Sequence, residues 1–476
     1  MPRSKRSSNH CSEGTSSSGS GSGGTGTGTS DREFDSDIIQ LTKLRSRPSK
    51  HMSGRINGKC DNWVSPVKML AAREGNYSTR SKFAASDGCH VVSRYLPVNG
   101  PFLVDQMESS AYVSQFSPDG SLLVAGCQGS RIRVYNVENG WKVHKDIMAK
   151  SLRWTITDTC LSPDQRFLIY SSMSPVVHIV NVESGVKESL ANVTEIHEGL
   201  NFAMENDDRD EYISGIFSVK FSTDGREIVA ASSDSAIYVY DLSTNQCTLR
   251  LFAHEDDVNT VCFADESGHL MYSGSDDTFC KVWDRRCLNA RGRPAGTLVG
   301  HLEGITFIDS RGDGRYLISN GKDQTIKLWD IRKMSSNSKA SSAHRNHNWD
   351  YRWMEYPAHR RKMKHPKDQS VETYRGHSVL RTLIRCHFSP EFSTGQKYIY
   401  TGSNDGAVYI YDLVSGDVVA KLDNHEDTVR DCSWHPYYPT LVSSSWDTMI
   451  VRCEYTGDPE TPSPIRRRTR RRRQIV

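Results

Sequence analysis

Short runs of alternating apolar and polar residues, separated by turn residues, fill the chain from about residue 94 to residue 455. Each unit of this pattern has a strand that ends near a turn such as SPDG, a second strand that ends in a small or hydroxyl residue, and a third strand that ends near an aromatic residue. One unit reads VNTVCFADESGHLMYSGSDDTFCKVWD, and seven such units follow one another. The pattern predicts an all-β repeat domain.

The spacing of the third strands indicates how many strands each unit contains. Four of the six steps between their closing residues are close to the length of a four-stranded blade, about 45 residues. The two longer steps predict insertions, near residues 191–212 and 334–372. The closing residues are Tyr135, Val180, Tyr240, Trp283, Trp329, Tyr411 and Cys453.

Two short amphipathic helices are predicted ahead of this domain, within residues 34–76. The first places four apolar residues near one face at helical spacing, namely Phe34, Ile38, Ile39 and Leu41. In the second, Ser65 is a candidate N-cap, Pro66 the first helical residue and Gly75 the stop. Amphipathicity leaves two interpretations open: the helices dock on their own domain, or they form an arm that binds a partner.

Two consecutive units share one signature, SGSDDTFCKVWDRR at residues 273–286 and SNGKDQTIKLWDIR at residues 319–332. In each copy an Asp precedes the Trp by six residues, a second Asp follows the Trp, and an Arg lies two residues further on. Strand alternation predicts that each Trp points into its blade, while the following Asp and Arg share the other face. Because the copies belong to adjacent blades, we expect Arg286 and Arg332 to be neighbours on one rim, where guanidinium groups suit carboxylate recognition.

The repeat resembles the WD-repeat family over about residues 94–455. This resemblance implies a seven-bladed β-propeller whose blades have four antiparallel strands. It also implies buried structural hydrogen-bond sets, which lock turns and are not expected to be catalytic. The two clearest sets are His254, Ser273, Asp277 with Trp283, and His301, Ser319, Asp323 with Trp329. Two further sets are His377, Thr401, Asp405 with Tyr411, and His425, Ser443, Asp447 with Cys453.

The final unit stops at its third strand, near Tyr455, so its outermost strand has to come from elsewhere. The segment from Ser93 to Gln106 is the candidate, because it would close the ring and remove an open sheet edge. The expected organisation is a disordered Ser/Gly-rich leader (1–33), a helical arm (34–76), the propeller (93–456) and a basic tail (457–476).

The paired WDxR sequence resembles that of the substrate receptors of cullin-4 RING ubiquitin ligases, which dock on the damage-specific DNA-binding adaptor protein. The likeness extends to TYRGHSVLRTLIRCHFSPEFSTGQKYIYTGS, NWDYRW and DIIQLTKLR, which look like the eleventh-type branch of that receptor family and its plant relatives. It implies a non-catalytic ligase subunit that brings an unidentified target protein to ubiquitin transfer. It assigns adaptor contact to Arg286, Arg332, Asp284, Asp330, Ile38, Ile39 and Leu41.

Composition agrees with a binding protein. The chain has 476 residues and twelve Cys without a CxxC pair, so neither a disulfide framework nor a zinc site is expected. It has no phosphate loop, nucleophile elbow or HExxH motif, so no enzyme, cofactor or metal is predicted. An apolar run long enough for a membrane span and a signal-peptide core are both missing, which favours a nuclear and cytoplasmic location.

Two basic segments support an alternative function. The tail holds seven of the arginines, whose removal changes the net charge from +3 to −4, and it is typical of a nuclear localisation signal or a nucleic-acid patch. Its arginines are Arg466, Arg467, Arg468, Arg470, Arg471, Arg472 and Arg473. The second insertion mixes Trp349, Tyr351, Trp353 and Tyr356 with cations, which fits either single-stranded nucleic acid or a loop anchored on the propeller by its Trp residues. The alternative is therefore a nuclear, nucleic-acid-associated WD-repeat scaffold.

Overall fold

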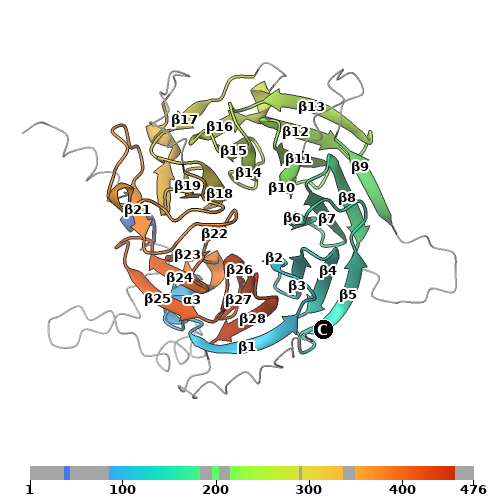
Figure 1. Cartoon of the computed structure of the whole chain (residues 1–476), viewed down its shortest axis with the longest axis horizontal. Helices are drawn as coiled ribbons and strands as arrows, with labels where there is room; N and C mark the ends of the chain where they lie inside the picture. The colour runs from blue at the N-terminus through green and yellow to red at the C-terminus, as the bar shows by residue number, and fades with distance from the viewer. Residues whose placement is uncertain are drawn as a thin grey trace, which may run out of the picture.

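The strands form a ring of sheets around a central axis (Figure 1). The computed structural model describes residues 37–42, 85–182, 196–202, 215–288, 292–335 and 349–455. Within these ranges there are seven sheets, each of four antiparallel strands. The all-β, seven-bladed propeller is confirmed.

The first three blades consist of β2 (Ala111–Phe116), β3 (Leu122–Cys127), β4 (Arg131–Asn136), β5 (Lys142–Met148); β6 (Ile156–Leu161), β7 (Phe167–Ser172), β8 (Val176–Asn181), β9 (His197–Asn201); and β10 (Ile216–Phe221), β11 (Glu227–Ser232), β12 (Ala236–Asp241), β13 (Gln246–Phe252). The fourth and fifth consist of β14 (Val258–Phe263), β15 (Leu270–Ser275), β16 (Cys280–Asp284), β17 (Gly296–Leu298); and β18 (Ile305–Ser310), β19 (Tyr316–Gly321), β20 (Thr325–Asp330), β21 (Glu372–Arg375). The last two consist of β22 (Cys386–Phe388), β23 (Tyr398–Gly402), β24 (Ala407–Asp412), β25 (Val418–Asp423); and β26 (Val429–Trp434), β27 (Thr440–Ser445), β28 (Met449–Glu454) with β1 (Asn99–Gln106). The helical elements are α3 (Ala85–Val92), α4 (Glu391–Thr394), η1 (Arg285–Cys287), η2 (Ile331–Lys333) and η3 (Ala358–Arg360).

The hydrophobic cores lie between neighbouring blades. Val229 and Ile237 of the third blade, for example, belong to one core cluster with Val258 and Trp283 of the fourth. All six positions of β19 and of β20 are buried, because these strands are covered on both faces. The outermost strand β5 buries only one of its seven positions. The decrease in burial from the inner strands to the outermost strand explains why the inner strands are the easiest to recognise in the sequence.

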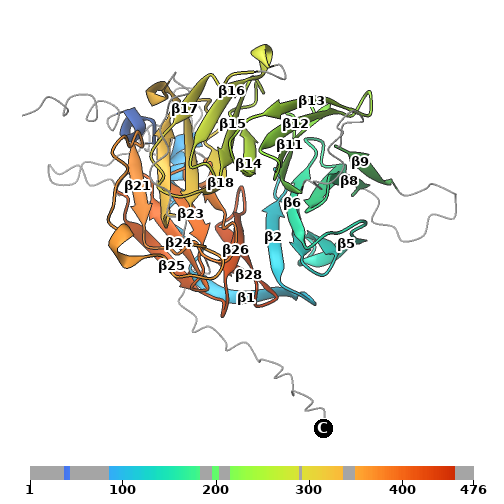
Figure 2. The ribbon, with the colours of Figure 1, turned by 45° about the horizontal axis from the view of Figure 1, so that its top comes forward.

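The N-terminal strand closes the ring. β1 pairs with β28 in antiparallel register, with Phe102 opposite Arg452 and Gln106 opposite Met449. Figure 2 shows β1 running along the lower edge of the ring beside β28. The prediction that the segment from Ser93 to Gln106 supplies the missing strand is confirmed, although the strand itself begins at Asn99.

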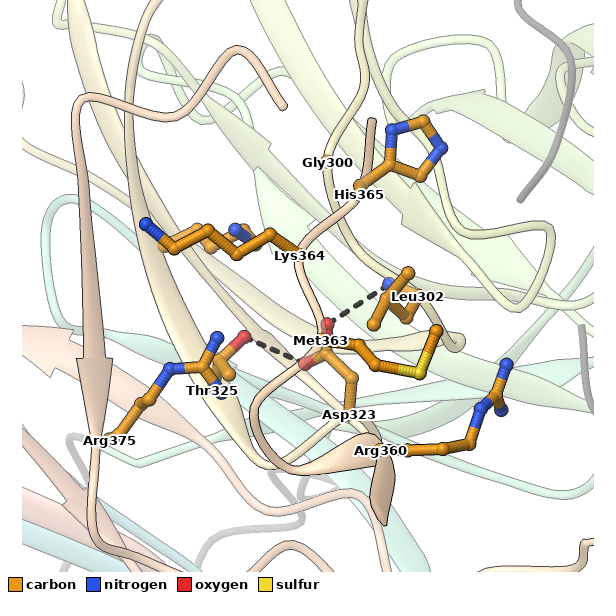
Figure 3. Close-up of a pocket in the computed structure, with 10 residues that line it drawn as sticks. Gly300, Leu302, Asp323, Thr325, Arg360, Met363, Lys364, His365 and Arg375 are labelled. Atoms are coloured by element: carbon orange, nitrogen blue, oxygen red, sulfur yellow. Dashed lines mark hydrogen bonds between the residues drawn. The ribbon is translucent and has the colours of Figure 1, made fainter. Parts of the chain in front are cut away.

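The two clearest hydrogen-bond sets are formed as predicted. In the fifth blade, His301 donates to Asp323 (3.0 Å) and accepts from the Ser319 hydroxyl (2.7 Å), and the Trp329 indole donates to that hydroxyl (2.7 Å). Asp323 also accepts from the Leu302 amide and the Thr325 hydroxyl (Figure 3). In the fourth blade, equivalent bonds of 2.7 to 2.8 Å join His254, Asp277, Ser273 and Trp283. The seventh-blade set of His425, Asp447 and Ser443 is formed too, and Cys453 replaces the Trp.

The predicted set of the sixth blade is wrong. His377 bonds to the Tyr411 hydroxyl (2.9 Å) and to the Asn320 side-chain oxygen (3.1 Å) of the preceding blade. Thr401 instead donates to the carbonyl of Arg385, and Asp405 accepts from Tyr409. A phenol reaches further than an indole nitrogen, so Tyr411 contacts the imidazole directly and takes the place of the hydroxyl residue.

The new partners of His377 predict a pH effect on stability. Both are neutral, and burial lowers the pKa of His377 from 6.5 to about 4. The unfolded chain therefore binds a proton as the pH falls through 6.5, whereas the folded chain does not until about 4. His377 should therefore lower the free energy of unfolding by on the order of 3 kcal/mol as the pH falls from 6.5 to about 4.

Urea unfolding of the wild type and His377→Gln at about pH 7 and pH 4.5 isolates this contribution, because Gln keeps hydrogen-bonding groups without titrating. We expect the variant to lose less stability on acidification. Identical pH dependence in the two proteins would contradict the neutral, buried imidazole.

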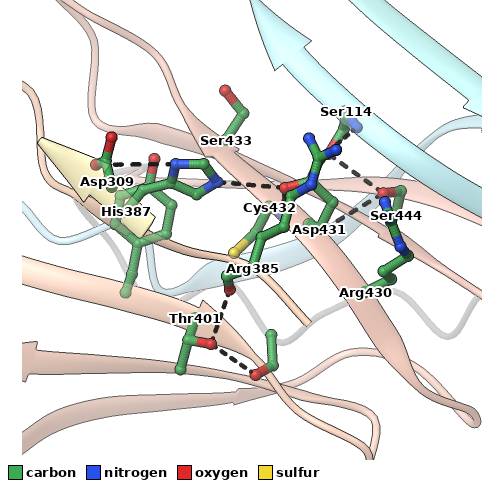
Figure 4. A network of polar contacts seen from close by, with 12 residues as sticks. Ser114, Asp309, Arg385, His387, Thr401, Arg430, Asp431, Cys432, Ser433 and Ser444 are labelled. Atoms are coloured by element: carbon green, nitrogen blue, oxygen red, sulfur yellow. Dashed lines mark hydrogen bonds and ion pairs between the residues drawn. The ribbon is translucent and has the colours of Figure 1, made fainter. Parts of the chain in front are cut away.

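Buried ion pairs join blades through the middle of the ring, and Figure 4 shows the contacts around Asp431. Arg385 of the sixth blade reaches Asp158 of the second blade (2.8 Å) and Asp431 of the seventh (3.2 Å). Lys220 of the third blade also donates to Asp158 (2.8 Å), and His387 lies 3.3 Å from Asp431. These charges connect four blades through the middle of the ring, so they are structural contacts.

The first predicted insertion contains part of a blade. β9 lies inside the segment assigned to it and pairs with β8 as the fourth strand of the second blade. Its sequence HEGLN lacks an apolar alternation, which explains why periodicity did not reveal a strand.

Candidate protein-binding face

The two WDxR arginines lie on one side of the ring. In β20, Thr325 pairs with Arg375 at one end of the blade, and Asp330 ends the strand at the other. η2 follows Asp330, and η1 follows Asp284 of β16 in the same manner in the adjacent blade. The side of the ring that carries η1 and η2 is called the arginine face below.

Arg286 is held outward by Asp284. The Asp284 carboxylate caps η1 by accepting from the Arg286 amide (3.1 Å), and it also accepts from Nε (2.9 Å) and Nη2 (2.6 Å) of the same residue. Hydrogen bonding to Arg286 lowers the pKa of Asp284 to about 2. The Arg286 side chain is 63% exposed. Within the described ranges no acceptor contacts its Nη1, which leaves a charged donor facing solvent.

Arg332 has the same local geometry. Its amide donates to Asp330 Oδ1 (3.0 Å), and its Nη2 donates to Oδ2 (2.8 Å). In both copies the strand ends at the Asp, so the expected strand alternation through the Arg is wrong: the carboxylate folds back to cap a 3₁₀ turn. The turn presents both arginines on the same face, as expected from their adjacent blades.

The adaptor contact predicted for Asp330 stays a prediction, and in this structure the residue holds two arginines. Its side chain is fully buried, and it accepts from Arg315 (3.1 Å) in addition to Arg332. Burial raises its pKa, although the Arg315 charge opposes that change. Asp330 therefore orients arginines, while Asp284, at 23% exposure, is only partly accessible. The sequence did not reveal Arg315, because it follows an ordinary RGDG turn.

Residues 37–42 are helical, and this helix lies on the arginine face. Asp37 pairs with Arg315 (2.9 Å) and with Arg332 (3.2 Å). Ile38 is 4% exposed and belongs to the core cluster that contains Tyr316 and Leu413. The interpretation that the first helix docks on its own domain is therefore the one the structure shows.

The apolar side of this helix is occupied by the propeller itself. Ile39 and Leu41 are partly buried against the same cluster as Ile38. Burying a side chain of this kind contributes about 1.5–3 kcal/mol, which a free arm would forgo. The predicted contact of Ile38 with the adaptor stays a prediction, and in this arrangement Gln40 is the exposed position of the helix.

A helix that the sequence did not reveal lies nearby. α3 packs beside α4, with the Cys89 thiol donating to the carbonyls of Glu391 (3.1 Å) and Phe392 (3.3 Å). α4 follows the first strand of its blade, which places both helices on the arginine face. Gly88 within α3 lowers helix propensity, which hides it from pattern reading. The second predicted helix, near Ser65, lies outside the described residues.

The described residues contain no group of three His, Cys, Asp or Glu side chains that could hold a metal ion. Their ten cysteines are free thiols. No helix in these ranges is long and apolar enough to cross a membrane. The leader and the tail arginines fall outside them, so nuclear localisation stays a prediction.

Comparison with known proteins identifies the repeat. The family model described as WD domain, G-beta repeat, matches residues 108–136, 212–241, 245–284, 292–330, 368–412 and 416–451. The chain is 66% identical over 444 residues to the LEC14B homolog of Prunus armeniaca, covering 93% of both chains. It is 64% identical over 431 residues to the LEC14B protein of Lithospermum erythrorhizon, covering 90% of this chain and 91% of that protein.

A second group of relatives is named for association with DDB1 and CUL4. The chain is 38% identical over 371 residues to the DDB1- and CUL4-associated factor 11 homolog of Caenorhabditis elegans, covering 75% of this chain and 63% of that protein. The chain therefore belongs to the family of WD-repeat proteins that includes LEC14B and the DDB1- and CUL4-associated factor 11 homologs.

Proposed function

We propose that this chain is a non-catalytic substrate receptor of a cullin-4 RING ubiquitin ligase. It docks on the DDB1 adaptor through the arginine face and presents a target protein for ubiquitin transfer. The observation that carries the proposal is the pair of exposed guanidinium groups, Arg286 and Arg332, held by the same Asp-capped turn on adjacent blades. The names of the worm relatives support the choice of partner.

The geometry suits a protein partner that offers carboxylates or carbonyls. Both arginines have their orientation fixed by an Asp before any partner arrives, which lowers the entropy cost of docking. A planar guanidinium presents several donors, so part of it can bind Asp while another nitrogen bonds to the partner. The helix at residues 37–42 shapes this face by placing Asp37 beside Arg332.

The direct test is co-purification of full-length chain with DDB1. We expect Arg286→Ala with Arg332→Ala to weaken the complex by at least about tenfold, as truncation of central interface arginines commonly does. The double variant should remain folded, because the exposed Arg286 pair contributes at most about 1 kcal/mol and the buried Asp330 keeps Arg315 as a partner when Arg332 is removed. Unchanged urea midpoints would verify that point.

The chain contains a matched control for local geometry. Arg352 forms the same bidentate contact with Asp350 (3.0 Å from Nε to Oδ1, with the amide at 2.9 Å), and it is 62% exposed on the opposite side of the ring. Arg381 is likewise half-exposed and paired with Asp427. Arg352→Ala with Arg381→Ala should leave DDB1 binding unchanged. Equal DDB1 binding by the wild type, the Arg286/Arg332 double variant and this control would exclude the assigned function of Arg286 and Arg332.

A further inference from the structure

Residues 349–371, called the cap below, contact the fifth and sixth blades on the side of the ring opposite to the arginine face. They precede β21 and contact the loops that lead into the first strands of the fifth and sixth blades. Arg360 pairs with Glu303 ahead of β18, and the Arg381 amide ahead of β22 donates to the Tyr351 carbonyl (2.9 Å). The Lys322 ammonium lies 4.0 Å from the centre of the Tyr351 ring.

The inner side of the cap is firmly seated. Tyr356 is 3% exposed, and Trp349 packs against it edge to face at 5.0 Å between ring centres. Figure 3 shows Met363 and Lys364 over the recess that Leu302 and its neighbours line. The loop is anchored on the propeller, as one of the two interpretations predicted, but its buried aromatic residue is Tyr356, whereas Trp353 is exposed. The cap therefore presents a fixed outer surface.

The outer surface combines cations with exposed apolar side chains. The cap contains six Lys and Arg residues against three Asp and Glu residues. Trp353 is 87% exposed, Met354 49% and Met363 46%. Four exposed cations have no ion pair within the described ranges: Arg361, Lys362, Lys364 and Lys367. Unpaired cations and an exposed Trp on one segment are the complement of an acidic segment that carries bulky apolar residues.

The same surface is poorly suited to nucleic acid. Base stacking needs accessible ring faces, yet Tyr356 is buried and the Lys322 ammonium covers the Tyr351 ring. Trp349 is committed to Tyr356 and to the Glu355 carbonyl. Of the four aromatic residues that motivated the nucleic-acid interpretation, Trp353 alone projects into solvent. The exposed Met354, next to it in the sequence, is of a residue type common on adaptable protein-binding surfaces.

We propose that the outer surface of the cap binds an extended, acidic protein segment with bulky apolar side chains, through Trp353 and the exposed cations of the cap. This inference rests on the proposed receptor function and adds to it the chemistry of the target. Since the cap and the arginine face lie on opposite sides of the ring, target and adaptor bind together without competing.

The probe is a fluorescein-labelled peptide that alternates Glu-Glu with Phe-Leu, titrated with full-length chain and followed by fluorescence anisotropy. We expect saturable binding that weakens as salt rises, because exposed charges are screened beyond a Debye length of about 8–10 Å. Trp353→Ala with Lys362→Glu should weaken binding at least about tenfold. The control variant is Phe392→Ala with Lys142→Glu, which also changes one exposed aromatic residue and one exposed Lys, but on other elements.

Two comparison probes define the chemistry. A peptide in which Ser-Gly replaces Phe-Leu should bind more weakly, and oligothymidylate should show no cap-dependent binding. The proposal is overturned if the acidic apolar peptide fails to bind at low salt, if both double variants weaken it equally, or if oligothymidylate alone depends on the cap.

The cap variant should still co-purify with DDB1 at the wild-type level. If the arginine variant also retains DDB1 while peptide binding depends on the cap, the receptor function fails and the peptide surface stands. If the arginine variant loses DDB1 and the cap variant binds the peptide normally, the receptor function stands and the cap proposal fails.

Discussion

Replacing Asp158 by Ala is expected to lower the free energy of unfolding by about 3–5 kcal/mol. Its carboxylate is fully buried and accepts charged hydrogen bonds from Arg385 and Lys220, both at 2.8 Å. Burial alone would raise the pKa of Asp158, but these two cations hold it well below its ordinary value. Without the carboxylate, Arg385 keeps one Asp partner and a buried excess of positive charge.

The measurement is a urea unfolding midpoint at neutral pH, compared with Asp423→Ala. Asp423 also pairs with a Lys at 2.8 Å, but its side chain is 67% exposed. Loss of that surface pair should cost at most about 1 kcal/mol. Similar midpoints for the two variants would show that the buried charges in the middle of the ring do not stabilise it.

Replacing Trp329 by Ala is expected to cost about 3–5 kcal/mol, because a fully buried indole leaves a large cavity. The change also removes the indole donor to Ser319 (2.7 Å), which joins the third strand to the His301 and Asp323 turn. Trp353→Ala is the matched control, since that indole is 87% exposed and its loss should change stability by about 0.5 kcal/mol or less.

Thermal or urea unfolding of the two Trp variants checks this contrast. If Trp353→Ala destabilises the protein as much as Trp329→Ala, then the cap is part of the folding core and its outward Trp has a structural function. That outcome would also remove Trp353 from the proposed target surface.

The repeat frame could be predicted because it depends on local patterns. Strand alternation, the length of each blade and the position of Trp283 and Trp329 all follow from residues close together in sequence. Counting strands also predicts that the last unit lacks a fourth strand of its own, and β1 supplies it. These features repeat, so several copies of the pattern support each assignment.

The site could be predicted only in part, because its remaining features depend on contacts between distant segments. An apolar stripe cannot tell whether Ile38 meets its own propeller or another protein. Whether Asp330 is exposed depends on Arg315, which precedes the neighbouring strand β19. The sequence also contains WDxR a third time, at residues 349–352, and only the structure places Arg352 on the side opposite to Arg286.

Closure by β1 has a consequence for how the chain folds during synthesis. Each of the first six blades is built from strands that emerge one after another, whereas β1 ends at Gln106 and its partner begins at Met449. At about 5–20 residues per second, β1 leaves the ribosome roughly 20–70 s before β28. Until then the growing ring is an open arc with an unpaired strand at its start, so the nascent protein depends on protection from aggregation until its last strand arrives.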